Sequence, residues 1–537
     1  MLTGKRTDQI KVWGNTFGIA AKRNKLNTNA QAQSNTDKHC ERSWYGPETC
    51  RNAIEYQSGV PADGTFVDRL FNHGYNVTLN GKMHVGAGLD EYPGKIHDFP
   101  FAAEPWDSMA RYHSRPLGPV IGTKGVEPHS KTRWTVPDDL PQPARPYDYK
   151  TANDCRAAIS GGIFSSDKPQ FLYCSLLVPH PKYQSNSTYM DLVKGLNFSY
   201  PEQIPWGQVH PYDLFAIAQK KTGDADQTAK DSPETIEHFR HVYFSMIREA
   251  DELLGSIVDA LDSAPGNVRD DVYIVFLSDH GDQMVEHRMD GKNNMYEAAA
   301  RVPIIINGPG IAKQQEIGTL VSLADIYPTL MHLAHVQKPT GLEGYSLMDL
   351  VQHETPLEEV EQRVQSQGGN STRKLEKGPL GAYGGGQEET TRADDVEESS
   401  RPDYIVAQYH SAYSVTGQFM VRQGDWKLIT YGSMPKGEAD FPPQLFNIPK
   451  DPWELHDMSR EHPEVVSAMS KILDEHMDWR LADAESKEFN RWWFKKYVVD
   501  KRGGSKTCMK TMQWLFGPTF NSSDASRTAS WLGESCD

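Results

Sequence analysis

The sequence predicts an α/β fold with a mixed, mostly parallel sheet covered by helices, and a smaller C-terminal subdomain with an antiparallel sheet. Two observations support this prediction. In the main part of the chain, short apolar runs of strand length alternate with segments of helical periodicity, which is typical of parallel sheets covered on both faces. Near the C-terminus, strand-like runs follow one another without intervening helices. We therefore divide the chain into a main domain at 1–352, an insertion at 353–402 and a C-terminal subdomain at 403–537.

Three strands are predicted from apolar runs that are rich in Val, Ile, Leu, Tyr and Phe and are bounded by turn residues. Each run is followed directly by a polar cluster. The runs and their clusters are NVTLN with GKMH, FLYCSLLV with PHPKY, and VYIVFL with SDHGD. A further apolar segment, VPIIING, comes later in the chain. Because ligands bind at the carboxyl ends of strands in open α/β sheets, the polar clusters are predicted to meet at one edge.

Two helices have clear limits in the sequence. The first begins at Ser232-Pro233, a good N-cap followed by proline at the first helical position, and it ends at Pro265-Gly266. Apolar residues recur with helical period between these limits. The second helix begins at Ser322, because Ser322 and Asp325 have the spacing of a capping box.

The segment at 353–402 is acidic, rich in glycine and nearly free of large apolar residues. Such a segment buries too little apolar surface to offset the entropy lost on ordering, so we predict a disordered surface insertion. After it, successive antiparallel strands are predicted from DYIVAQYH, QFMVRQGD and WKLITYG, and a helix from HPEVVSAMSKILDEHM. The later stretch FNRWWFKKYVV is more typical of a packed helix than of a binding patch.

Composition and charge disfavour several classes of function. The chain has 537 residues, of which 38% are hydrophobic and 24% charged, which is ordinary for a soluble globular protein. Its formal net charge of −16 disfavours binding to nucleic acid or to anionic membranes, so an anionic ligand requires a local basic site. No apolar run is long enough to span a bilayer, and the first residues lack the apolar core of a secretory signal.

Cysteines and sequons bear on the cellular compartment. Six cysteines are too few for a disulfide scaffold, but Cys40 with Cys50, and Cys508 with Cys536, could each close a local bridge in an oxidising compartment. Four unrelated thiols explain the same residues equally well. The N-x-S/T sequons favour the secretory pathway weakly, because chance alone supplies a few of them. They are Asn76, Asn186, Asn197, Asn370 and Asn521.

Two of the polar clusters suggest a metal and an anion. Asp279 and His280 lie where a strand ends, and a carboxylate beside an imidazole suits a metal ion, although Asp-His-Gly also occurs in ordinary turns. Lys82 and His84 are two residues apart just after a strand, so they project to the same side if the chain stays extended. A fixed cation beside a proton-transfer group suits an anionic substrate.

The other two clusters add a histidine and a lysine. His180 lies between prolines that restrict its backbone, and Lys292 lies in a loop before an apolar segment. A lone lysine in a polar loop is more often a solvated surface residue. Together, however, the clusters supply lysines, histidines and an aspartate at one edge of the sheet. We therefore predict a metal-assisted site for an oxyanion such as sulfate or phosphate, in which lysines hold the anion and imidazoles move protons.

The ordered set of motifs is similar to that of the sulfatase family. The motifs are GYNVTLNGKMHVG, VPHP, FLSDHGDQMVEHRMDGKNNMYEAAARVPIIINGPG and VSLADIYPTL, followed by FMVRQGDWKLI, LFNI and DPWEL in the C-terminal part. Two stretches, MVEHRMDGKNNMYEAAARVP and SLADIYPTL, most resemble the arylsulfatase K-like members. The resemblance covers nearly the whole chain except the insertion and the tail, and it implies an alkaline-phosphatase-like fold.

The resemblance also implies roles for the candidate residues. Asp279 and His280 match ligands that form half of a Ca²⁺ site, and Lys82 and Lys292 match the lysines that hold the sulfate. His180 matches a histidine near the ester oxygen, a natural proton donor to the leaving alcohol. These are the residues to which their chemistry alone assigns anion binding and proton transfer.

The nucleophile that the resemblance implies is formylglycine, made from a cysteine in C-x-P-S-R or C-x-A-x-R. His84 matches the histidine that helps formylglycine release bound sulfate. None of the six cysteines lies in such a motif. The family motif runs into Leu-Thr-Gly-Arg, and Leu2-Thr3-Gly4-Lys5 stands in that place. We therefore expect the nucleophile and two metal-binding aspartates ahead of Met1, and we expect the chain as written to be inactive.

The family activity is hydrolysis of sulfate monoesters. The implied substrate is a sulfated sugar or glycosaminoglycan, the implied location is lysosomal or extracellular, and the full-length form needs a formylglycine-generating enzyme as partner. Two alternatives stay open. The absent cysteine favours a non-catalytic relative that binds sulfated glycans. A two-zinc phosphoesterase of the same fold ranks lower, because it needs further Asp and His ligands where this chain has Lys82 and Lys292.

Overall fold

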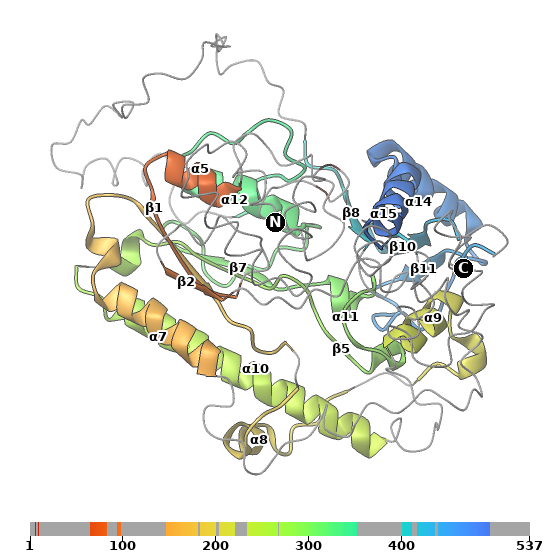
Figure 1. The fold of residues 1–537 in the computed structure, drawn as a ribbon, viewed down its shortest axis with the longest axis horizontal. Coiled ribbons are helices and arrows are strands. Elements are labelled where there is room, and N and C mark those ends of the chain that lie inside the picture. Colours follow the sequence, from red (N-terminus) through yellow and green to blue (C-terminus); the bar gives the residue numbers. More distant parts are fainter. Residues whose placement is uncertain are drawn as a thin grey trace, which may run out of the picture.

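The computed structural model describes a main sheet with its helices and a C-terminal sheet (Figure 1). The described residues are 6, 9, 65–82, 94–97, 146–180, 183–199, 203–220, 233–266, 268–351, 400–410, 416–434 and 439–494. The cysteine pairs Cys40–Cys50 and Cys508–Cys536 lie outside them, as does the predicted insertion from 353 to 399. The predictions made for those segments stay predictions.

A three-stranded parallel sheet forms the centre of the main domain. β1 (Asn76–Lys82) lies between β2 (Gly94–His97) and β3 (Gln170–Ser175), and both neighbours run parallel to it. β1 and β3 contain the apolar runs NVTLN and FLYC from which strands were predicted. The carboxyl ends of the three strands therefore lie at one edge of this sheet.

Gly81 allows β1 to approach β3 closely at that edge. It pairs with Ser175, its φ is +98°, and a Cβ built on it would lie 1.9 Å from the Ser175 carbonyl oxygen. No side chain fits in that space, so a glycine is required immediately before Lys82.

A second pair of strands is antiparallel. β4 (Ile274–Leu277) pairs with β7 (Ile304–Asn307). The short strands β5 (Gln283–Met284) and β6 (Asp290–Gly291) pair with each other in the connection between them. That connection contains only one short α-helix, α11 (Glu297–Ala300), rather than the long crossover that a parallel pair needs. The main domain is therefore mixed in strand direction, as predicted.

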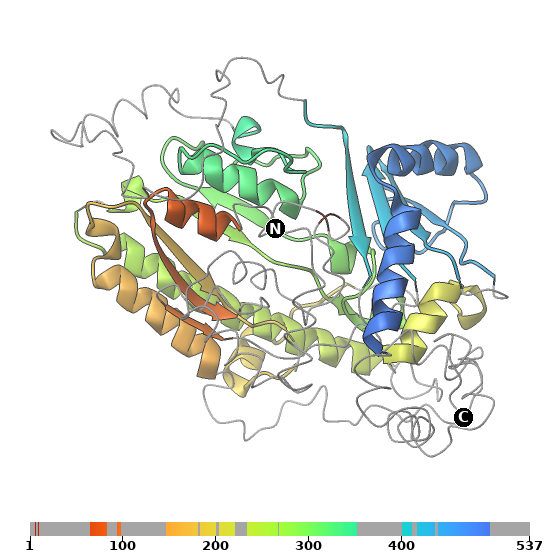
Figure 2. The ribbon, with the colours of Figure 1, turned by 45° about the horizontal axis from the view of Figure 1, so that its top comes forward.

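Helices cover the central sheet on both faces (Figure 1, Figure 2). On one face lie α5 (Phe66–Asn72) and α12 (Ile326–Leu333), which share a buried apolar cluster with β1. On the other face lie α7 (Pro146–Ser160) and the 30-residue α10 (Pro233–Asp262), which the two views show side by side. Covering of both faces is the arrangement expected for strands that are buried on each side.

Both predicted helix starts are confirmed. α10 begins at Pro233, and Ser322 forms a capping box with Asp325 at the start of η7 (Leu323–Asp325), which leads into α12. None of the described helices is long and apolar enough to cross a membrane. The remaining described helices are η3 (Ile163–Ser165), α8 (Ser187–Val193), η4 (Trp206–Gln208), α9 (Pro211–Lys220), η5 (Val268–Asp271), η6 (Glu286–Arg288) and η8 (Leu347–Asp349).

The C-terminal part forms an antiparallel sheet in the order β11-β10-β9-β8. Its strands are β8 (Tyr404–Tyr409), β9 (Gln418–Gln423), β10 (Trp426–Tyr431) and β11 (Gln444–Asn447). α14 (Pro463–His476) and α15 (Trp479–Phe494) follow the sheet. β8, β9, β10 and α14 match the predicted strands and helix, whereas β11 and the first ten residues of α15 were not predicted. Phe489, the first residue of the aromatic stretch, is buried in α15, in keeping with a packed helix.

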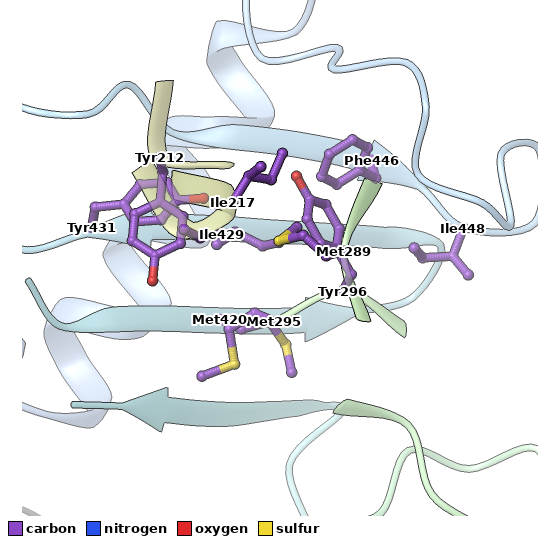
Figure 3. Close-up of a cluster of buried hydrophobic side chains, with 11 residues drawn as sticks. Tyr212, Ile217, Met289, Met295, Tyr296, Met420, Ile429, Tyr431, Phe446 and Ile448 are labelled. Atoms are coloured by element: carbon purple, nitrogen blue, oxygen red, sulfur yellow. The ribbon is translucent and has the colours of Figure 1, made fainter. Parts of the chain in front are cut away.

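An apolar cluster joins the main domain to the C-terminal sheet (Figure 3). Its members come from α9, from the connection between β4 and β7, and from the C-terminal sheet. They are Tyr212, Ala216, Ile217, Met289, Met295, Tyr296, Met420, Ile429, Tyr431, Phe446 and Ile448. Because this core removes apolar surface of both parts from water, it fastens the C-terminal sheet to the connection between β4 and β7.

A disulfide that the sequence analysis did not predict ties α7 to β3. Cys155 of α7 and Cys174 of β3 are bonded across a sequence separation of 19 residues. Cys155 is fully buried, and Asn80 of β1 donates a hydrogen bond to its sulfur at 3.8 Å. The bridge thus attaches a covering helix to the sheet close to the end of β1.

Replacing both Cys155 and Cys174 by alanine is expected to lower the free energy of unfolding by about 3 kcal/mol, because the bridge restricts the unfolded chain. Thermal unfolding of the double variant and the wild type in oxidising buffer measures the change. The wild type in reducing buffer serves as the control and should lose a similar amount. Equal melting temperatures in all three samples would contradict a stabilising bridge.

Candidate active site

The predicted site residues that the structure describes lie at or just beyond the ends of strands. Lys82 is the last residue of β1, so it still belongs to the sheet, whereas the sequence analysis placed it just after the strand. Asp279 and His280 follow β4, and Lys292 follows β6. His180 lies in the turn beyond β3, where its backbone N donates to the carbonyl of the third residue before it.

These side chains gather around Asp279. Its Oδ2 lies 3.9 Å from Lys82 Nζ, and its Oδ1 lies 3.6 Å from His280 Nε2. Lys292 Nζ donates a hydrogen bond to His280 Nε2. The ring centroids of His180 and His280 are 6.3 Å apart. The structure therefore brings together, from four separate segments, every predicted site residue that it describes.

The contacts of His280 determine which ring nitrogen carries the proton in the neutral ring. Its Nδ1 lies 2.8 Å from the carbonyl oxygen of Gly281. A carbonyl oxygen only accepts, so Nδ1 carries the hydrogen and Nε2 presents a lone pair. That lone pair points toward the ammonium of Lys292 and lies near Asp279, at the centre of the cluster.

Partial burial and neighbouring charges shift the pKa values of the cluster. Burial lowers the pKa of Lys292 to about 8, and the carboxylate of Asp279 opposes that change. Burial alone would raise the pKa of Asp279, but the charges of His280, Lys82 and Lys292 together bring it below its ordinary value. Burial also lowers the pKa of His280. Two lysines beside a single carboxylate make a positive site that suits an anion.

The loop that carries Asp279 and His280 rests on α11. Gly281 N donates a hydrogen bond to Ala299 O at 2.8 Å. A Cβ on Gly281 would lie 2.1 Å from the Ala298 carbonyl oxygen, although the φ of Gly281 is not in the positive range. Close packing against α11, rather than turn geometry, therefore requires this glycine.

Comparison with known proteins identifies the family. The model of the Sulfatase family matches residues 36–336, which is more than half of the chain. The chain belongs to the sulfatase family. This sulfatase is similar to Arylsulfatase K of Gallus gallus, with 26% identity over 464 residues that cover 84% of this chain and 74% of that protein. The family resemblance predicted from the motifs is confirmed.

Solved structures share the fold of this sulfatase. A 2-O GAG sulfatase has a TM-score of 0.50 at 19% identity, over 79% of this chain and 76% of that one. A phosphonate monoester hydrolase from Silicibacter pomeroyi has a TM-score of 0.52 at 17% identity, over 78% of this chain and 81% of that one. At these identities the likeness concerns the fold alone, and it confirms the predicted alkaline-phosphatase-like architecture.

Sulfatases generally use a divalent metal, and Asp279 and His280 are the residues that the sequence predicts as its ligands here. Asp279 offers a carboxylate, the ligand type that Ca²⁺ prefers, and His280 offers an unprotonated nitrogen of the kind that transition metals prefer. Within the described ranges, no group of three or more His, Cys, Asp or Glu side chains could hold a metal ion. The donor types of these two residues suit a divalent metal, and both the ligands and the Ca²⁺ stay predictions.

The loop before Lys292 in this sulfatase has a strained backbone and is held by a buried ion pair. Val285 and His287 have left-handed φ values of 76° and 53°, which cost roughly 1 kcal/mol or more each in residues other than glycine. Glu286 between them pairs with Arg240 of α10 at 2.7 Å, and both side chains are only 6% exposed. The buried ion pair holds the loop in a shape that its backbone does not favour.

Other polar contacts at the site were not predicted from the sequence. Tyr183 OH donates to Asp282 Oδ1 at 2.8 Å, and Gln418 Nε2 of β9 donates to Asn293 O, next to Lys292, at 3.0 Å. The partners are 99 and 125 residues apart in the chain, so no local spacing indicates them. His84 lies outside the described residues, and its position stays a prediction.

Proposed function

We propose that this sulfatase hydrolyses sulfate monoesters of sulfated sugars, including glycosaminoglycans. The proposal depends chiefly on one observation, the convergence of Lys82 and Lys292 on the corner formed by Asp279 and His280. Two ammonium groups at one point suit the sulfate of such an ester, because they balance the charge that a tetrahedral anion brings into a partly dehydrated site.

The chemistry assigns a separate task to each group. Lys82 and Lys292 hold the sulfate and stabilise the negative charge that develops on it. His180, whose ring lies 6.3 Å from that of His280, protonates the oxygen of the leaving alcohol, because an imidazole exchanges protons near neutral pH. His84 assists the release of sulfate, by the resemblance of its motif.

Asp279 and His280 are the protein ligands that we propose for the divalent cation, with Ca²⁺ as the family's metal. A bound cation would polarise the sulfate oxygens and add positive charge to the site. The positions of the two ligands follow from the end of β4 and from the support of the loop by α11. The Nδ1–H bond to Gly281 fixes the ring orientation of His280.

The sugar substrate in this proposal is inferred from the names of similar proteins. The 2-O GAG sulfatase of similar fold is named for a glycosaminoglycan substrate, and Arylsulfatase K of Gallus gallus is named for aryl sulfates. Both names have hydrolysis of a sulfate ester in common. Sulfate esters are the substrate class, and a sulfated sugar is the proposed natural member of it.

The nucleophile in this proposal is formylglycine, made from cysteine by a formylglycine-generating enzyme. None of the six cysteines in the printed sequence lies in the motif which that enzyme modifies. Activity is therefore best measured on two samples: the printed chain, and the longest reading frame of its gene co-expressed with the modifying enzyme.

A secretory or lysosomal location is also part of the proposal. The disulfide between Cys155 and Cys174 suits an oxidising compartment. Asn76 and Asn197 are exposed, as glycan acceptors must be. Asn186 is 3% exposed and its side chain caps α8, so it does not accept a glycan in the folded protein.

Replacing His180 by alanine is expected to slow esters with poor leaving groups far more than esters with good ones. The alkoxide of a sugar needs a proton as it leaves, whereas 4-nitrophenolate is stable without one. We expect a loss of about 10²–10⁴-fold in kcat for a sulfated disaccharide and a loss of less than about tenfold for 4-nitrophenyl sulfate. Release of inorganic sulfate or of 4-nitrophenolate gives the two rates.

The matched control is His238→Ala, which removes an exposed histidine of α10 and should change neither rate. Equal losses on both substrates would exclude His180 as the proton donor. If the protein hydrolyses phosphate monoesters and releases no sulfate from sulfate esters, the proposed function is wrong and the protein is a two-zinc phosphoesterase. Binding of sulfated glycans without turnover by either sample would indicate a non-catalytic relative.

A further inference from the structure

Two motifs of the C-terminal part, QGDWKLI and DPWEL, take no part in the chemistry described so far, yet both reach α11. They contribute Lys427 of β10 and Glu454 of the segment after β11. Lys427 Nζ lies 3.0 Å from Glu297 Oε1 and 2.8 Å from Glu454 Oε1. The side chains of Lys427 and Glu454 are 0% and 2% exposed, so this pairing takes place away from water.

Glu454 caps the start of α11. Its Oε2 accepts a hydrogen bond at 2.6 Å from the backbone N of Glu297, the first residue of the helix. The N-cap residue, Tyr296, provides no side-chain cap of its own. Immediately before Glu454, Trp453 O receives a hydrogen bond from His287 Nε2 at 3.1 Å. The DPWEL segment thus holds both the strained loop and the helix that follows it.

The position of α11 matters because the helix supports the loop with Asp279 and His280. Gly281 N donates to a carbonyl of α11, and the space between them has no room for a Cβ. Figure 3 shows Tyr296, just ahead of α11, beside Phe446 of β11, and their ring centroids are 6.0 Å apart. The helix is therefore packed between the C-terminal sheet and the site.

The buried charges themselves favour a positioning role. A buried ion pair contributes little to stability relative to apolar residues of similar volume, since removing both charges from water is costly. Glu454 also has a left-handed φ of 57°, a further cost in a residue other than glycine. Glu454 occurs here despite both costs, which favours a role for the orientation of its carboxylate. That carboxylate points toward the first backbone N–H of α11.

We propose that Glu454, oriented by Lys427, is a positioning residue for the anion site. It fixes α11, and through the contact with Gly281 it fixes the corner formed by Asp279 and His280. The proposal rests on the proposed function in one respect, namely that sulfate is the ligand of this corner. Glu454 touches no reacting group in this account, and it acts only through α11.

The test is the affinity for inorganic sulfate, measured by calorimetric titration of the full chain well below its melting temperature. Glu454→Ala removes the acceptor, and Glu454→Asp withdraws the carboxylate by one methylene. Both are expected to weaken sulfate binding by about tenfold or more, because ångström-scale misplacement of a binding group costs up to about 10²-fold. Glu454→Gln keeps an oxygen of the same reach and is expected to bind sulfate with nearly the wild-type affinity.

Arg401→Met is the matched control. Arg401, which lies just ahead of the C-terminal subdomain in the segment predicted as an insertion, forms another ion pair with the main domain, at 2.9 Å from Asp325 Oδ2, and its side chain is 15% exposed. Its other hydrogen bonds go to the carbonyl oxygens of Tyr345 and Ser346 and not to α11. This variant is expected to melt at a lower temperature and to bind sulfate as tightly as the wild type.

The outcomes separate the two proposals. Failure of the wild type to bind sulfate would overturn the proposed function. Sulfate binding that is normal in the wild type and unchanged in Glu454→Ala and Glu454→Asp would overturn the positioning role alone. Equally weak binding by Glu454→Gln or by Arg401→Met would also overturn it, because charge loss or general loosening would then explain the effect. If Glu454→Ala does not fold, the sulfate affinity of Glu454→Asp tests the positioning role.

Discussion

Replacing Lys292 by alanine is expected to lower kcat/KM for 4-nitrophenyl sulfate by about 10²–10³-fold, the usual effect of removing one preorganised charge from a site where negative charge develops. The ammonium of Lys292 hydrogen-bonds to His280 Nε2 and its side chain is half-buried, so little water competes with it for an anion. Lys82 remains in the variant, and weak binding of sulfate is therefore expected to survive. Initial rates and a sulfate titration measure the two effects.

Two further variants test whether the loss of activity in Lys292→Ala is specific to this lysine. Lys471→Ala removes a lysine that is 76% exposed on α14, and it should leave kcat/KM unchanged. Lys292→Arg keeps the charge but presents a planar, wider group, so it should recover only part of the lost activity. A Lys292→Ala variant that keeps wild-type kcat/KM would show that this lysine does not hold the sulfate.

The elements that the sequence predicts correctly are those with local signals. β1 and β3 are apolar runs bounded by turn residues, α10 begins at Pro233, and Ser322 caps its helix as its spacing with Asp325 indicates. The site residues could be listed for the same reason, because each lies at or near the end of such a strand. The parallel pairing of β1 and β3 then brings Lys82 and His180 to one edge of the sheet, whereas the approach of Asp279, His280 and Lys292 from the separate strand pairs β4–β7 and β5–β6 does not follow from that pairing.

Other features depend on contacts between distant residues and have no local signal. Cys155 and Cys174 lie in two different elements, and only the packing of α7 on β3 brings them together. β4 and β7 resemble other buried strands in composition, and the sequence does not indicate that they pair antiparallel. Glu454 caps a helix that begins 157 residues earlier in the chain. Periodicity and capping rules describe neighbours in sequence, so they cannot reveal such partners.

A chain of hydrogen bonds between α9 and the C-terminal sheet is another such feature. Tyr296 OH donates to Asp213 Oδ2 at 2.6 Å and accepts from Gln444 Nε2 at 2.8 Å, and Tyr431 OH donates to Gln444 Oε1 at 2.5 Å. Asp213 is 2% exposed, and its Oδ1 has no hydrogen-bond partner among the described residues. Burial raises the pKa of Asp213 to about 7; the bond from Tyr296 opposes this rise, and the charge of Glu454 adds to it.

The raised pKa of Asp213 predicts a loss of stability as the pH rises. In the unfolded chain this carboxyl ionises near its ordinary pKa of 3.8, and in the folded protein it ionises near 7. Between these values the folded state holds a proton that the unfolded state has lost. The stability that this retained proton contributes to the folded protein is fully present below pH 4 and is lost as the pH rises through 7. Its full size is about 4 kcal/mol, since one pKa unit corresponds to about 1.4 kcal/mol.

Asp213→Asn isolates this contribution, because the amide does not ionise and still accepts the hydrogen bond from Tyr296. We expect the wild type to lose about 2 kcal/mol relative to the variant between pH 5 and pH 7, measured as the difference in melting temperature. Burial lowers the pKa values of His287 and His210 to about 3 and about 4, but both histidines are present in both proteins and cancel in the difference. Asp271→Asn, which changes an exposed aspartate, should show no such dependence on pH. A constant difference between wild type and Asp213→Asn across this range would mean that Asp213 ionises alike in the folded and unfolded states, and the buried network would then have no part in the response to pH.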